Sequence, residues 1–255
     1  MENMGVFKEL LSFSKGLIAE PELRLREIAG GGTRAAIPIV IYIVYILANA
    51  LFMEIKPPDF PAEFAPLGLR EKSWIFYFSV ELWWCTIFTA AFSALFLYFL
   101  RIFSAGKIFL KALVCAAAVS ALTAAAFYAR SAPVFLLLSA VMLLFMARVI
   151  RAEQKTWWRF FQAALALNLI GAIVLPLEFA AVYLRSENLF IVAVLAAGLW
   201  ILLLLIKMAG IFTGAGIPKA VISLGAGLCS ALLFIFLLCR AGVISPEIYE
   251  LMFTL

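Results

Sequence analysis

Histidine is absent from this chain of 255 residues, and only 14% of the residues are charged. The absence of histidine removes the commonest general base and the commonest metal ligand. The four cysteines stand apart in the sequence and form no CxxC pair, which argues against a zinc site, an iron–sulfur site or a disulfide framework. We therefore expect no metal and no other cofactor.

Motifs of soluble enzymes are also missing. The chain contains no GxxxxGK[ST] phosphate loop, no HExxH and no GxSxG. No polar segment is long enough to fold into a soluble domain with an active site. The net charge of +5 is spread over short loops rather than gathered on a basic helix, so nucleic acid is not an expected partner. We expect a protein that is not an enzyme.

Apolar residues dominate what is present. They make up 66% of the chain, and its mean hydropathy is +1.11, whereas a soluble domain is roughly half apolar and about a quarter charged. The expected partner of this surface is the lipid bilayer. Because the apolar runs are continuous and do not alternate with polar residues, they predict helices rather than a membrane barrel. The predicted fold class is all-α: a polytopic bundle of membrane helices preceded by a short amphipathic helix.

The number of spans follows from the lengths of the apolar runs, since a helix needs about 20 mostly apolar residues to cross the hydrocarbon core. Seven runs qualify: Ala35–Met53, Trp74–Leu100, Ile108–Tyr128, Ala132–Ile150, Phe160–Leu184, Leu189–Met208 and Pro218–Cys239. The tight turn at Arg130, Ser131 and Pro133 leaves an alternative, in which the third and fourth runs form a re-entrant pair. The predicted organisation is an amphipathic interfacial segment over residues 1–34, a transmembrane domain over 35–239 and a short tail over 240–255.

The basic residues predict the orientation. When they are assigned to alternate loops, 14 fall on one face and 6 on the other. The positive-inside rule places the more basic face in the cytoplasm. We expect a multi-pass protein of a prokaryotic cell membrane, with its N-terminus cytoplasmic and its C-terminal tail external.

Three stretches carry a family resemblance. They read PELRLREIAGGGTRAAIPIVIYIVYILANAL (Pro21–Leu51), RIFSAGKIFLKA (Arg101–Ala112) and WILLLLIKMAGIFTGAGIPKA (Trp200–Ala220). The first resembles the opening of prokaryotic Yip-domain proteins, which are relatives of the eukaryotic Ypt/Rab-interacting membrane proteins, and the others resemble that family's cytoplasmic turns. The resemblance implies a membrane-organising role. The family usually has about five spans, and a Rab-type partner does not carry over, because this chain has only a short N-terminal segment.

Polar residues inside the spans are the candidates for function, because they are costly in a membrane. Glu81 and Glu178 lie about two turns inside the outer ends of their spans. Asn49 lies near the outer end of the first span and could join them, and Asn168 lies deeper in the fifth span. One interpretation is a polar site for an ion, a proton or a lipid headgroup, with Pro176 opening a cavity beside it. The alternative, which the sequence favours, is that both carboxylates reach water or pair with Lys72 or Arg185.

Basic and aromatic residues stand together in the predicted cytoplasmic turns. The candidates for contact with lipid headgroups are Lys107, Lys111, Arg151, Lys155 and Arg159. Such clusters suit anionic lipids, but they equally form an ordinary interfacial belt, and the belt is the favoured interpretation.

Three functions are compatible with these features. The first is a non-enzymatic scaffold or organising protein of Yip-like type, with other membrane proteins or a second copy of the chain as partners. The second is a transporter or permease subunit with a polar site at Glu81 and Glu178, and the weakest is an intramembrane enzyme acting on lipid. Because the polar residues are few and lie in the outer half of the predicted spans, the sequence favours the scaffold.

Overall fold

A computed structural model of the chain describes residues 2–57, 59–61, 72–103, 107–128 and 131–252. The described residues fold into helices, with no strand among them. In chain order the elements are α1 (Glu2–Ala19), α2 (Pro21–Gly30), α3 (Ala36–Ile55), α4 (Trp74–Val80), the π-helical turn η2 (Glu81–Cys85), α5 (Thr86–Ile102), α6 (Ile108–Tyr128), α7 (Ala132–Ala152), α8 (Gln154–Ala166), α9 (Asn168–Tyr183), α10 (Glu187–Thr213), α11 (Ile217–Arg240) and α12 (Pro246–Leu251). The predicted all-α class is confirmed.

Six helical segments are long and apolar enough to cross a membrane: α3, α4 to α5 through η2, α7, α8 to α9, α10 and α11. Helix α6 carries a further apolar stretch, Leu110–Ala124 within the described part of the chain, so the predicted count of about seven is approximate. The third and fourth apolar runs are two separate helices, and Arg130, in the turn between them, lies outside the described residues. These lengths establish an integral multi-pass membrane protein.

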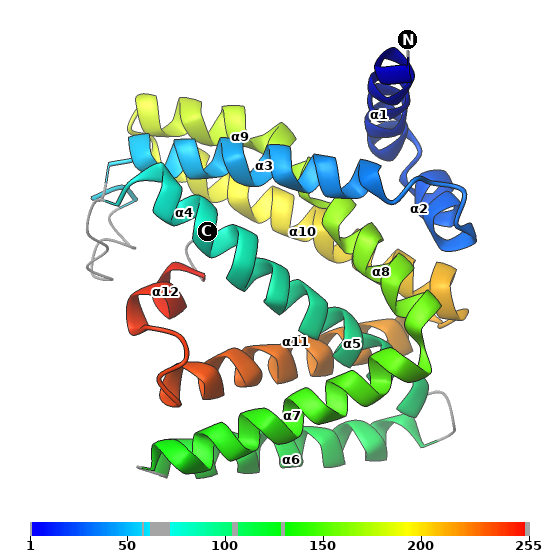
Figure 1. Cartoon of the computed structure of the whole chain (residues 1–255), viewed down its shortest axis with the longest axis vertical. Helices are drawn as coiled ribbons and strands as arrows, with labels where there is room; N and C mark the ends of the chain where they lie inside the picture. The colour runs from blue at the N-terminus through cyan, green and yellow to red at the C-terminus, as the bar shows by residue number, and fades with distance from the viewer. Residues whose placement is uncertain (1, 58, 62–71, 104–106, 129–130, 253–255) are drawn as a thin grey trace.

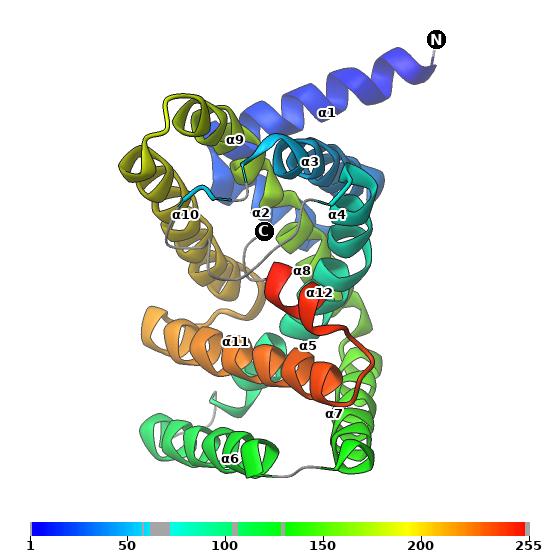
Figure 2. The same ribbon diagram turned by 90° about the vertical axis from the view of Figure 1, so that its left-hand side faces the viewer.

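The helices form two packed groups joined by α5. Figure 1 shows α3, α9 and α10 on one side of the bundle and α6, α7 and α11 on the other. Helix α5 packs against α11 and also contacts α7 and α8, while α3 packs against α4, α8 and α9. Figure 2 shows that α1 projects away from both groups.

A chain of aromatic rings fills the centre where α5, α8 and α10 meet. The Phe96 and Phe160 rings lie edge to face with centroids 5.4 Å apart, and Phe160 meets Phe212 in the same way at 5.3 Å. Phe96 and Phe160 are fully buried. On the opposite side of Phe96, Gly227 of α11 lies so close that an added Cβ would be 3.1 Å from the Phe96 Cα. The absence of a side chain at Gly227 therefore sets the close approach of α5 and α11.

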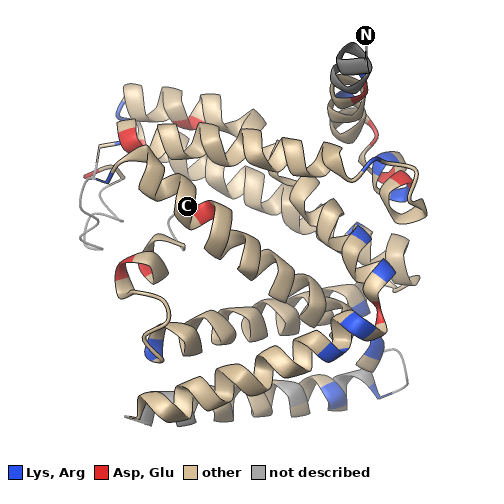
Figure 3. Ribbon diagram, viewed as in Figure 1, with Lys and Arg blue, Asp and Glu red and all other residues tan. Residues whose placement is uncertain are grey.

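Charge is distributed unequally along the bundle. Figure 3 shows lysine and arginine gathered at the end where α2, the α5–α6 turn and the α7–α8 turn lie, which we call the basic end. At the opposite end, α12 folds back onto the bundle, with Leu251 buried against a cluster that includes Phe60 and Val80. The predicted C-terminal tail is thus packed through α12 over its described part.

The predicted N-terminal segment is two helices with different surroundings. Phe13 and Leu17 of α1 are buried, but Leu11 and Ile18 on its other side are exposed by 48% and 43%. Helix α1 contacts α2, and α2 in turn packs against α8 and α10. The amphipathic pattern is therefore present in α1, which rests on α2.

Helix α2 is fastened to the bundle by burial and by polar contacts. Leu25 and Ile28 are fully buried. The Arg159 Nη1 donates to the Ala29 carbonyl oxygen at 2.6 Å, and Lys207 forms an ion pair with Glu22 at 2.7 Å. The hydrogen bond from Lys207 lowers the pKa of the Glu22 carboxyl. These contacts hold the N-terminal segment against the basic end.

Replacing Arg159 with methionine should loosen α2. The substitution keeps an apolar stem but removes the charge-assisted hydrogen bond to the part-buried Ala29 carbonyl, which costs about 1.5–3 kcal/mol. We expect faster amide hydrogen exchange across Pro21–Gly30 than in the unaltered protein. Arg151→Met is the matched control, because Arg151 is exposed at the end of α7. Equal exchange in the two variants would show that Arg159 does not hold α2.

Candidate functional site

The most enclosed acidic side chain of the described spans is Glu81, which is 3% exposed. It begins the π-helical turn η2, which interrupts the second span between α4 and α5. A π-helical turn widens the helix and disturbs its regular backbone ladder, and such turns are frequent at functional sites. The chain therefore places a carboxyl group at an irregular point of a membrane helix.

Asn49 provides the partner of this carboxyl group. Its amide Nδ2 donates to the Glu81 Oε1 at 2.9 Å, and Asn49 is itself only 4% exposed. Asn49 belongs to α3, so the bond joins the first span to the second. The structure thus brings together two of the four polar residues that the sequence singled out.

The backbone of Glu81 is held by a second residue of α3. The Tyr42 hydroxyl donates to the Glu81 carbonyl oxygen at 2.7 Å. The same hydroxyl lies 3.0 Å from the Thr86 Oγ1. Because a tyrosine hydroxyl has a single proton, Thr86 is the donor in this second bond. Tyr42 therefore fastens both ends of η2 to α3.

No cation is paired with Glu81 in the part of the chain that the structure describes. The two basic residues expected as alternatives have other partners: Lys72 binds Glu247 at 3.2 Å, and Arg185 lies 3.6 Å from Asp59. An unpaired charge in the bilayer is costly. The Glu81 carboxylate is therefore expected to be neutralised by a bound proton or a bound cation. The oxygens around it belong to hydroxyl, amide and carbonyl groups, which are ligands of the kind that hard cations prefer.

Glu178 lies in a different setting, on α9. It is half-buried, and the charged group that acts on it is Lys56, just beyond the end of α3. Burial lowers the pKa of the Lys56 ammonium, and the negative charge of Glu178 opposes that change. The Lys56 Nζ also lies 5.6 Å from the centre of the Phe190 ring. No hydrogen bond or ion pair joins Glu178 to Glu81 among the described residues.

Tyr45 fills the space between α3 and α9. A Cβ on Gly171 would lie 2.5 Å from the Tyr45 ring, so the glycine makes room for the ring. Asn168 does not reach this region with its amide, because its Nδ2 donates to the Leu165 carbonyl of its own chain segment at 3.0 Å. That bond lies at Leu167, where α8 ends and α9 begins. Asn168 therefore lies at the junction of α8 and α9, and Pro176 follows within α9.

The five basic candidates are not equivalent. Arg159 is committed to α2, and the Lys111 Nζ donates to the Ile102 carbonyl at the end of α5 at 2.9 Å. Lys107, Arg151 and Lys155 are exposed. Contact with lipid headgroups stays a prediction for Lys107, Arg151 and Lys155. Arg159 and Lys111 instead donate to backbone carbonyls.

The two tryptophans next to these basic residues also differ in whether they face the protein or its surroundings. The Trp157 Nε1 donates inward to the Ala90 carbonyl of α5 at 3.3 Å, and its ring stacks on Phe161 with centroids 5.6 Å apart. Trp158 is 40% exposed, as an interfacial anchor would be. Trp157 thus joins α8 to α5.

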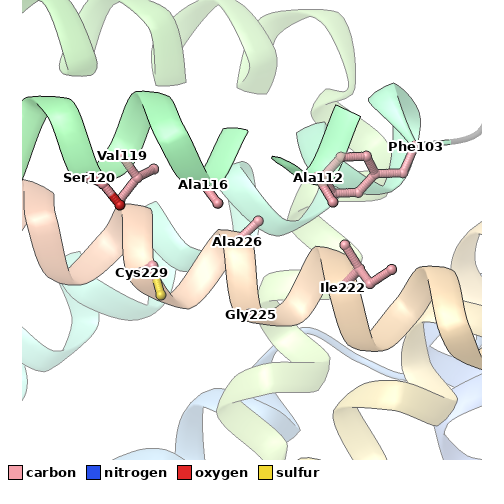
Figure 4. A pocket seen from close by; sticks show the side chains of 9 residues that line it. All are labelled: Phe103, Ala112, Ala116, Val119, Ser120, Ile222, Gly225, Ala226 and Cys229. Carbon is pink, nitrogen blue, oxygen red and sulfur yellow. The ribbon is translucent and has the colours of Figure 1, made fainter. Parts of the chain in front are cut away.

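An apolar groove of about 330 Å³ lies between α6 and α11. Figure 4 shows small side chains on both walls, with Ala112, Ala116 and Ser120 facing Ala226 and Cys229. Small residues allow helices to approach closely. The groove offers Ser120 and Cys229 as its polar or polarisable groups, so it has little that could orient a substrate.

Two residues of the Glu81 site were not predicted from the sequence: Tyr42 and Thr86. The signal for Tyr42 was the spacing of polar residues in the first span, since Tyr42, Tyr45 and Asn49 recur at i, i+3 and i+7 and so share one helical face. Thr86, in the second span, is not part of that pattern. The π-helical turn has no comparable sequence signal. We define the Glu81 site as Glu81, Asn49, Tyr42 and Thr86.

Comparisons with protein-family models, with curated proteins and with solved structures gave no match.

Proposed function

We propose that the protein is a membrane transport protein, or a transport subunit, in which Glu81 takes up and releases a proton or a small cation inside the second span. One observation carries the proposal: a carboxyl group that is 3% exposed in a membrane helix has an amide as its partner and no basic partner among the residues that the structure describes. Intramembrane carboxyl groups of this kind are the usual sites of proton or ion coupling. The proposal takes the second of the functions that the sequence allows.

Irregular helices support this choice. Transporters form their sites at interruptions of membrane helices, and the second span here is interrupted by η2 at Glu81. The fifth span is one helical segment of 30 residues, Gln154–Tyr183, with a turn at Leu167 and Pro176 within it. Because α3 packs against both of these spans, a change in the charge of Glu81 would act on the contact between α3 and η2.

The test is ion movement in liposomes that contain the purified full chain. We expect an imposed proton or sodium gradient to drive uptake of that ion into the liposomes. Glu81→Gln should lower the rate of this ion uptake by at least about tenfold, which corresponds to a rise of about 1.4 kcal/mol in the free-energy barrier to transport. Glutamine preserves the size and the hydrogen bonding but cannot exchange a proton or bind a cation by charge. Glu178→Gln is the matched control, since Glu178 lies outside the Glu81 site. Equal rates for all three proteins, or no uptake by the unaltered chain, would overturn the proposal.

A membrane-organising role of Yip-like type is the second candidate. The observation that favours it is α1, which projects from the bundle with Leu11 and Ile18 exposed, as a surface for the membrane interface or for a partner would. This role requires no ion movement. It therefore predicts that Glu81→Gln behaves like the unaltered chain in the same assay.

The proposed orientation places the basic end in the cytoplasm. The gathering of lysine and arginine at that end supports it (Figure 3). With α6 as a seventh crossing beside the six segments named above, the N-terminus would be cytoplasmic and α12 external, in a prokaryotic cell membrane. In that frame the Glu81 site lies in the outer half of the second span.

A further inference from the structure

A polar hollow of about 270 Å³ lies at the basic end, where the last turn of α5, the α7–α8 turn, the end of α10 and the first turn of α11 converge. Its polar lining is Arg101, Glu153, Thr156, Thr213 and Lys219, and leucine and phenylalanine side chains form the remaining wall. We call it the basic-end pocket. It shares no residue with the Glu81 site and none with the five basic residues singled out in the sequence.

The charges in the basic-end pocket leave an excess of one positive charge. Arg101 forms an ion pair with Glu153, which joins α5 to the α7–α8 turn. Lys219 enters from α11 and is half-buried, and it has no acidic partner among the residues that the structure describes. Two cations and one carboxylate thus face the same space.

The remaining polar groups of the basic-end pocket are suited to an anion. The Thr156 hydroxyl is half-buried and makes no hydrogen bond within the described part of the chain, so its proton is available to a ligand. The Thr213 hydroxyl already donates to the Ala209 carbonyl at 2.7 Å. Lys219 also stands in the first turn of α11, a helix of 24 residues whose backbone N–H groups at this end favour negative charge.

We infer that the basic-end pocket binds a phosphate group, with Lys219 and Thr156 as its donors and the Arg101–Glu153 pair as its charged wall. Lysine binds phosphate as a point charge, and arginine binds phosphate oxygens through paired N–H groups. The phosphate can belong to the headgroup of an anionic phospholipid or be free in solution. The apolar wall and the position at the end of the membrane helices favour the lipid.

Binding is tested with the full chain in detergent and three probes: dioctanoyl phosphatidic acid, dioctanoylglycerol, which lacks the phosphate, and inorganic phosphate. We expect phosphatidic acid to bind and dioctanoylglycerol not to bind, as measured by native mass spectrometry. Lys219→Met should weaken the binding of phosphatidic acid by at least about tenfold, the usual effect of losing one charge-assisted hydrogen bond. Lys219→Arg should restore most of it, which separates a lost charge from a lost fold.

Two further variants sharpen the test. Arg148→Met removes one positive charge from an exposed position on α7 outside the pocket, and it should leave binding within about twofold. Glu153→Gln removes the negative charge from the wall and should strengthen binding.

Each outcome decides the question. Displacement of the lipid by inorganic phosphate would identify a site for soluble phosphate, and its absence would identify a headgroup site. Equal weakening by Lys219→Met and Arg148→Met, unchanged binding in both, or equal binding of dioctanoylglycerol would overturn the inference.

Discussion

Replacing Gly227 with valine is expected to destabilise the bundle more than any other single substitution considered for this chain. The added Cβ would lie 3.1 to 3.2 Å from the backbone N and Cα and from the Cβ of Phe96, and valine adds two methyl groups beyond it. Because Phe96 is fully buried against Phe160, it has no free space to move into. Overpacking of this kind costs typically about 1–3 kcal/mol, and sometimes more.

The measurement is thermal unfolding of the purified protein in detergent. Gly225→Val is the control, since Gly225 lies on the same helix and a Cβ there has no neighbour within 4 Å. We expect the melting temperature to fall clearly for Gly227→Val and to change little for Gly225→Val. Equal melting temperatures would mean that α5 and α11 do not approach as closely as described.

The second large effect is expected at the Glu81 site. Asn49→Leu removes the donor to Glu81 Oε1 and leaves a buried carboxyl group without its partner, which costs about 1–3 kcal/mol. Leucine has the same number and branching of side-chain heavy atoms as asparagine, so no cavity is left. We expect a lower melting temperature. On the proposal that Glu81 carries a proton or a cation, the rate of ion uptake into liposomes should fall as well.

A double variant separates the hydrogen bond from the shape of the site. Replacing both partners of a buried polar pair with apolar residues can be nearly neutral. We therefore expect Asn49→Leu with Glu81→Leu to be more stable than Asn49→Leu alone, while transport is abolished. If the two substitutions were simply additive in stability, Asn49 and Glu81 would not be in contact.

Much of the fold could be predicted from the sequence because the bilayer constrains length. The predicted run Ala35–Met53 differs from α3 by one residue at its start and two at its end, and Pro218–Cys239 lies within α11. The fifth run was predicted to begin at Phe160, yet α8 begins six residues earlier, at Gln154. That extension depends on Trp157, which packs inward on α5. An aromatic residue near a charged turn looks the same in sequence whether it faces lipid or protein.

The candidate site could be predicted only in part. Depth along a span follows from sequence position, so Glu81 and Glu178 were expected at similar depth, with Asn49 near the outer end of the first span. Which of them meet depends on how the helices rotate and pack: Asn49 turns toward Glu81, and Lys56 is the charged neighbour of Glu178. The π-helical turn and the bonds of Tyr42 depend on contact between α3 and the second span, which no local pattern encodes.

Reaction with carbodiimides tests most directly whether Glu81 is a carboxyl group enclosed in the membrane. A hydrophobic carbodiimide enters the bilayer and modifies protonated carboxyl groups there, whereas a water-soluble one modifies exposed carboxyl groups. Membranes containing the full chain would be treated with each reagent and analysed by peptide mass spectrometry, with the 62%-exposed side chain of Glu247 as the reference. We expect the hydrophobic reagent to modify Glu81 and the water-soluble reagent to modify Glu247 but not Glu81. Modification of Glu81 by the water-soluble reagent as readily as Glu247 would contradict the account.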